Sequence, residues 1–96
     1  MLVTAHKVEV EAPDGAAALE LEHRLAALRP AAAFRRDRWV VDLGGVHSVE
    51  DVAAEAKDWL RLIGANVTTM HVDGYPRTIV SERHFRHRSL HADFIG

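Results

Sequence analysis

Polar and apolar residues alternate from Val3 to Glu11, which is the pattern of a strand with one face buried. The two faces of this strand differ in character, with Thr4, His6, Val8 and Val10 on one side and Lys7, Glu9 and Glu11 on the other. Pro13 then interrupts the alternation. The pattern therefore predicts a first strand that ends just before Pro13.

A helix is predicted to follow, from an N-cap at Asp14 to about Leu28. Leucines recur at helical spacing at Leu21, Leu25 and Leu28, while the residues between them are largely polar. An aspartate side chain accepts hydrogen bonds from the free N–H groups of a first helical turn. Pro30 has no N–H and closes the segment.

The segment from Ala32 to Leu43 fits either one long strand or two short ones. We favour two strands, because a single strand would carry the four charged residues Arg35 to Arg38 through its middle. A turn exposes those charges to water. The cluster has neither glycine nor asparagine, which tight hairpin turns prefer.

The clearest amphipathic helix begins after Gly44-Gly45, which we expect to release the chain from the preceding strand. Ser48 is the predicted N-cap, and Gly64 is the predicted end. Apolar residues fall on one helical face at Val52, Ala56, Trp59, Leu60 and Ile63. These five positions are the predicted core of the helix.

Val67 to Val72 is predicted to form a further strand, with Thr68, Met70 and Val72 on one face. Asp73-Gly74-Tyr75-Pro76 is typical of a turn. Arg77 to Glu82 then supplies one more expected strand.

The predicted elements give an α+β chain in β-α-β-β-α-β order, which indicates a ferredoxin-like plait, a split βαβ fold of two layers. The expected domain spans residues 1–82. Residues 83–96 form a C-terminal extension that is either flexible or packed on a partner subunit. If Ala32 to Leu43 is one strand, the alternative is a three-stranded parallel βαβαβ sheet, ranked second because one face of such a sheet is poorly covered.

Composition supports one folded domain. The 96 residues are 48% apolar and 27% charged, with a formal net charge of −2. The chain has no cysteine, which excludes disulfides, thiolate metal sites and a cysteine nucleophile. We find neither a signal peptide nor a membrane span, and we expect a cytoplasmic protein with no membrane partner.

Three of the seven histidines, His84, His87 and His91, stand in one short run. In a helix they would share a face and converge on a metal ion. Arg88 would lie on that same face, and its fixed charge opposes cation binding. We therefore predict no metal site, and the sequence names no cofactor.

The C-terminal part of the chain is weakly basic. Residues 76–96 sum to +2, and Phe85 and Phe94 stand among the arginines, as in segments that contact nucleic acid. The excess charge is small, so we favour a packing extension. Nucleic acid is not a favoured partner.

Two strand-to-helix loops are candidate sites for a small-molecule ligand. One contains Asp14 and Gly15, and the other contains Gly44 and Gly45. Free N–H groups at a helix start bind anions. Capping by Asp14 and a sharp bend at the glycines explain the same residues without a ligand.

Catalytic candidates are few. Ser81 and His84 are close in sequence but lack the turn that exposes a serine nucleophile. His6 and His71 lie on predicted strands, and histidine titrates near neutral pH. They are the candidate acid or base in an enzyme.

The sequence Trp39-Val40-Val41 is apolar on both faces of its strand, although a two-layer plait leaves one sheet face open. We therefore predict that these three residues form an interface in a homodimer. The function favoured by the sequence is a small non-catalytic regulatory or ligand-binding module. The alternatives are a dimeric enzyme that uses a strand histidine, and a nucleic-acid or metal contact through the C-terminal extension.

Overall fold

The computed structural model describes residues 5–81. Within this range lie five strands, two α-helices and a short 3-10 helix. In chain order they are β1 (His6–Ala12), α1 (Gly15–Arg24), η1 (Ala26–Leu28), β2 (Ala31–Arg35), β3 (Arg38–Val46), α2 (Val49–Ile63), β4 (Val67–Val72) and β5 (Tyr75–Val80).

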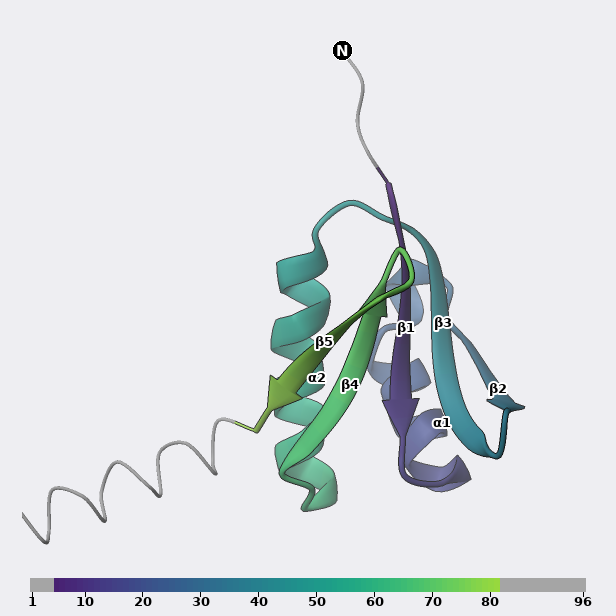
Figure 1. Ribbon diagram of the computed structural model, residues 1–96. Coiled ribbons are helices and arrows are strands. Elements are labelled where there is room, and N and C mark those ends of the chain that lie inside the picture. The colour runs from purple at the N-terminus through teal and green to yellow at the C-terminus, as the bar shows by residue number, and fades with distance from the viewer. Residues whose placement is uncertain (1–4, 82–96) are drawn as a thin grey trace, which may run out of the picture.

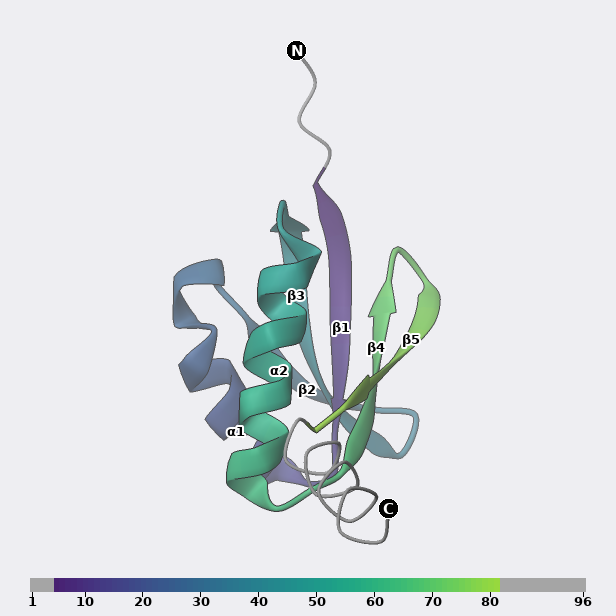
Figure 2. The ribbon, with the colours of Figure 1, turned by 90° about the vertical axis from the view of Figure 1, so that its left-hand side faces the viewer.

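The strands form one sheet in the order β2-β3-β1-β4-β5, and all neighbouring strands are antiparallel. Both helices lie behind the sheet in Figure 1, and the side view in Figure 2 shows them together on one face. The described chain is thus α+β, as expected. The three-stranded parallel alternative is wrong, because Ala32 to Leu43 reverses direction.

The reversal takes place at Arg36 and Asp37, which join β2 to β3. Arg35 pairs directly with Arg38, so the connection is a two-residue hairpin turn. Both turn residues have positive φ, 53° at Arg36 and 63° at Asp37. The charged cluster is therefore a turn, as predicted, although its residues are not those that such turns favour.

The core lies between the sheet and the two helices. Val8 and Val10 are fully buried, which confirms the predicted alternation along β1. On α2, Val52, Ala56, Trp59 and Leu60 are also fully buried. Ile63 is partly buried against the same core, so the predicted apolar face of this helix is confirmed.

Trp59 also connects the two helices. Its indole Nε1 donates a hydrogen bond of 2.8 Å to the backbone carbonyl of Ala17 on α1. The ring therefore fills the core and satisfies its only polar atom at the same time.

The first helix is shorter than predicted. It ends at Arg24, and Ala26–Leu28 form a 3-10 turn in place of continued α-helix. Arg29 then takes a left-handed conformation with φ 54°. Pro30 explains this change, because it disfavours helical backbone at the residue before it and offers no N–H itself.

Gly44-Gly45 does not release the chain from the sheet, since β3 continues to Val46. Val8 pairs with Leu43 and His6 with Val46, so β3 holds one extra residue and forms a β-bulge. Gly45 has φ 71°, a conformation that glycine adopts without strain. The helix starts after Ser48 as predicted, and the Oγ of Ser48 accepts the N–H of Asp51.

The last turn is tighter than expected. Asp73 and Gly74 alone form it, and Tyr75 and Pro76 already belong to β5. Proline is tolerated there because β5 is an edge strand, where a missing N–H breaks no ladder.

Candidate functional site: a charged cleft on the open face of the sheet

The sheet face opposite the helices has no covering element among residues 5–81, and we call it the open face. Figure 2 shows the β2–β3 turn and the β4–β5 hairpin both extending away from the helix layer, on the side of the open face. A cavity of about 490 Å³ lies there, which we call the cleft. Its lining comprises Lys7, Glu9, Glu11, Arg35, Arg36, Arg38, Val40, His71 and Gly74.

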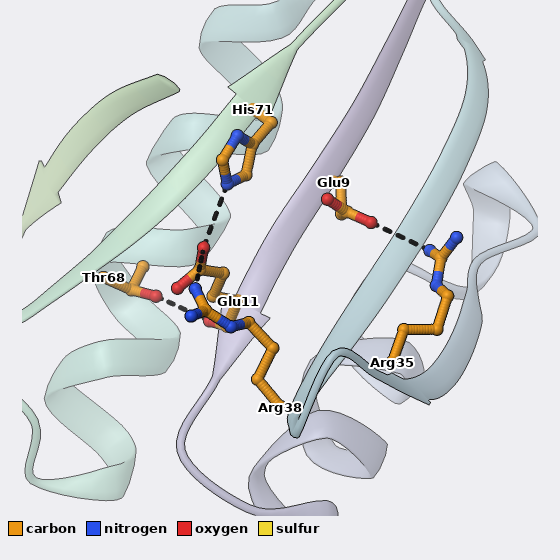
Figure 3. A network of polar contacts seen from close by, with 6 residues as sticks. All are labelled: Glu9, Glu11, Arg35, Arg38, Thr68 and His71. Carbon is orange, nitrogen blue, oxygen red and sulfur yellow. Dashed lines mark hydrogen bonds and ion pairs between the residues drawn. The ribbon is translucent and has the colours of Figure 1, made fainter. Parts of the chain in front are cut away.

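Glu9 and Asp42 lie directly opposite each other on β1 and β3. Two carboxylates at such a position repel each other. Arg35 offsets this repulsion, because its Nη2 donates to Glu9 Oε2 at 2.8 Å and also to Asp42 Oδ2. One arginine of the edge strand β2 thereby fixes a carboxylate on the central strand, as Figure 3 shows for Glu9.

Glu11 is the centre of a second group of contacts. His71 Nε2 on β4 donates to Glu11 Oε2 at 2.9 Å, and Arg38 Nη1 on β3 donates to the same oxygen at 2.9 Å (Figure 3). Thr68 Oγ1 donates to the backbone carbonyl of Glu11 at 2.6 Å. The carboxylate is thus held from both neighbouring strands.

These contacts change the titration of Glu11. Partial burial raises the pKa of its carboxyl, but the hydrogen bonds from His71 and Arg38 and their charges outweigh burial and lower it. Glu11 therefore stays ionised to lower pH than a free glutamate. The same hydrogen bond orients the His71 ring, with Nε2 toward the Glu11 carboxylate.

His6, the second candidate histidine, has its own carboxylate partner outside the cleft lining. Its Nδ1 donates to Asp73 Oδ2 at 2.7 Å, and the backbone N–H of Lys7 donates to Asp73 Oδ1 at 3.0 Å. These two hydrogen bonds, with His6 first, lower the pKa of Asp73. The structure therefore does not bring His6 and His71 into one site.

We expect acid to destabilise the fold through Glu11 and Asp73. Both pKa values are lower in the folded chain than the ordinary values of 4.5 and 3.8, so both groups contribute stability above the ordinary values. The contribution of Glu11 is lost as the pH falls below 4.5 towards its lower pKa in the folded chain. The contribution of Asp73 is lost in the same way below 3.8. Melting temperatures measured between pH 7 and 3 should therefore fall in this acid range.

The matched variants are Glu11→Gln and Glu20→Gln. Glu20 is exposed, and no ion pair to it exists within residues 5–81. Glu11→Gln should melt below the wild type at pH 7, and the gap should narrow as the pH falls. Glu20→Gln should follow the wild type throughout, and a constant gap for Glu11→Gln would contradict the assignment.

Neither of the predicted ligand loops lines the cleft, and the two loops lie at opposite ends of β1. Asp14 Oδ1 accepts the N–H of Ala17 at 2.8 Å, which confirms its capping role. A Cβ on Gly15 would lie 3.1 Å from the Trp39 ring, so packing requires a small residue there. Gly44 and Gly45 are in the bulge at the opposite end of β1. Ligand binding at either loop stays a prediction.

The three predicted interface residues point in different directions. Trp39 and Val41 pair with Ala12 and Val10, whose side chains face the helices, so these two residues face the helices too. Val41 is fully buried in that core. Val40 alone lies on the open face, where it lines the cleft and is 3% exposed.

The candidate metal and nucleic-acid residues of the extension lie outside the described residues: His84, His87, His91, Phe85 and Phe94. Ser81 is described and buried, but His84, its partner in the predicted pair, is not described. Residues 5–81 hold no group of three or more histidine, aspartate or glutamate side chains placed to bind a metal ion. In the same range no helix has the length and apolarity needed to span a bilayer.

Sequence reasoning identified His71 but missed its partners Glu11 and Arg38. A signal for them exists in the pattern: Glu9 and Glu11 share one face of β1, and a two-residue turn places Arg35 and Arg38 opposite each other on one face of the hairpin. The sequence pattern does not show the register in which this hairpin pairs with β1. The site rests on these contacts alone, since no family model, curated protein or solved structure matches the chain.

Proposed function

We propose that this protein is a small non-catalytic ligand-binding module, and that its ligand occupies the cleft on the open face. The observation that carries the proposal is the cleft itself, a concave site of about 490 Å³ with charged side chains of both signs. Sites for small molecules commonly have volumes of roughly 300–1,000 Å³ and a few fixed polar groups.

The polar groups of the cleft are held in place before any ligand binds. Arg35 is fixed by two carboxylates, and Glu11 is fixed by His71 and Arg38. Preorganisation of this kind lowers the entropic cost of binding.

The proposed architecture is a ferredoxin-like plait with one additional edge strand. The order β2-β3-β1-β4, antiparallel pairing and two helices on one face support it. We propose further that the cytoplasmic chain forms a homodimer through the β4–β5 part of the open face, outside the cleft lining, where Val67 and Val80 pair directly and are 55% and 40% exposed. Light scattering that gives the monomer mass at tens of micromolar would refute the dimer.

Binding can be tested with a panel of small molecules that covers several chemical classes. ¹⁵N-labelled protein is titrated separately with representative amino acids, organic acids, sugars, nucleotides and diamines, and amide shifts are recorded. We expect at least one class to shift Glu9, Glu11, Val40 and His71 while the helix residues Ala53 and Ala56 stay unchanged. Absence of any cleft shift across all classes would overturn the proposal.

An acid–base enzyme is the second candidate, and the hydrogen bond from His71 to Glu11 is the observation that favours it. A carboxylate orients the imidazole in many general bases. The same titrations distinguish the two functions, because a substrate would yield new product resonances and a ligand would not. Loss of product formation in His71→Gln would then assign the base.

A further inference from the structure

Two cations of the cleft have no ion-pair partner in the described part of the chain. Arg35 and Arg38 are neutralised by Glu9, Asp42 and Glu11. Lys7 and Arg36 line the same cleft, and neither makes a salt bridge within residues 5–81. The cleft therefore offers two positive charges that its own carboxylates do not neutralise.

These two cations lie at opposite ends of the cleft. Lys7 is near the start of β1, beside the β4–β5 turn that contributes Gly74. Arg36 is in the β2–β3 turn, next to Arg38 and beyond the pairing of Ala12 with Trp39. Figures 1 and 2 show these two turns at opposite ends of the sheet, both extending to the open side.

The span between the cations sets the length of a ligand that reaches both. Lys7 and Ala12 are five residues apart on β1, which corresponds to about 16 Å of strand at roughly 3.3 Å per residue. Arg36 lies beyond Ala12, so its backbone is more than about 16 Å from that of Lys7. Lysine and arginine side chains extend several ångströms each. The remaining gap matches a short chain with an acid group at each end.

Arg36 is also held in an unfavourable backbone conformation. Its φ is 53°, in the left-handed region where asparagine or glycine is preferred for this type of turn. Arg29, Asp37 and Asp73 share this conformation, and of the four only Arg36 lines the cleft. The position of Arg36 in the lining, and not its φ, therefore points to binding.

We propose that the ligand of the cleft is a small diacid, with one acid group bound by Lys7 and the other by Arg36. This inference rests on the proposed ligand-binding function. Between the two ends, Glu9 and Glu11 are already paired with Arg35 and Arg38, so this part of the cleft offers no free charge and the middle of the ligand is neutral.

The test uses three probes of equal carbon length: adipate, hexanoate and hexanediol. They are titrated into the ¹⁵N-labelled full chain at constant ionic strength. We expect adipate to shift the amides of Lys7 and Arg36 with a Kd about tenfold below that of hexanoate, since one charge-assisted contact is worth roughly a factor of ten. Hexanediol should not bind, and added salt should raise the Kd of adipate.

Two substitutions separate binding from folding. Arg36→Asn should weaken adipate binding about tenfold and raise Tm by about 2–5 °C, because asparagine suits the turn. Arg29→Asn is the matched control, since Arg29 has φ 54° but is absent from the cleft lining. It should raise Tm similarly and leave binding unchanged. Lys7→Gln should weaken binding without changing Tm.

Each contrary result has a definite meaning. The proposal of a diacid ligand would be overturned if adipate and hexanediol bound with equal affinity. It would also be overturned if adipate binding were unchanged in Arg36→Asn. If a sugar or diamine shifts the cleft amides while adipate does not, the diacid is wrong and the binding module stands. If no compound shifts them, both the diacid and the binding module are wrong.

Discussion

Replacing Trp59 with alanine is expected to destabilise the fold by about 3–5 kcal/mol. The side chain is fully buried between α2, α1 and the sheet, so truncation leaves a large cavity. It also removes the hydrogen bond from Nε1 to the carbonyl of Ala17. A domain of this size has a total stability of roughly 5–15 kcal/mol, so the variant should lose a large share of it.

Urea denaturation followed by far-ultraviolet circular dichroism measures this loss. Trp59→Phe is the matched control, because it keeps a buried aromatic ring but loses the indole N–H together with the volume of the five-membered ring. Its cost should be about 1–2 kcal/mol, close to that of one buried hydrogen bond. Equal losses in the two variants would show that packing of the ring is not the main contribution.

The helical and hairpin elements were predictable because their signals are local. Val52, Ala56, Trp59 and Leu60 follow the helical repeat, and Ser48 and Gly64 mark the ends of the same helix. Caps and periodicity depend on residues only a few positions apart. The turn at Arg36 and Asp37 was predictable for a related reason, since four consecutive charges are incompatible with the middle of a strand.

The cleft was not predictable in the same way, because its contacts join distant residues. Arg38 and Glu11 are 27 residues apart, and His71 and Glu11 are 60 apart. The sequence shows that Glu11 lies on the face of β1 opposite the buried one, but it does not show which side chains contact Glu11. Trp39-Val40-Val41 illustrates the same limit. Trp39 and Val41 face the helices and not the open face, and only their register with β1 shows this.

Replacing Val10 with glutamate is expected to unfold the domain. Val10 is fully buried at the centre of the sheet, paired with Val41 on one side and Met70 on the other. A carboxylate there loses its hydration and meets no cation, a cost that exceeds the roughly 5 kcal/mol at the lower end of domain stability. Far-ultraviolet circular dichroism and the dispersion of amide proton shifts should both indicate a largely unfolded chain.

Glu9→Val is the reciprocal control, one residue earlier on the same strand. Glu9 faces the cleft, and its partner Arg35 keeps the contact with Asp42 when Glu9 is removed. The loss should stay within about 1 kcal/mol, as for other partly exposed ion pairs, and valine suits a strand. Adjacent residues of a strand face opposite sides of the sheet. Val10→Glu should therefore unfold the domain, whereas Glu9→Val at the neighbouring position should fold. Similar stability in the two variants would contradict this assignment of the buried and open faces, and with it the cleft.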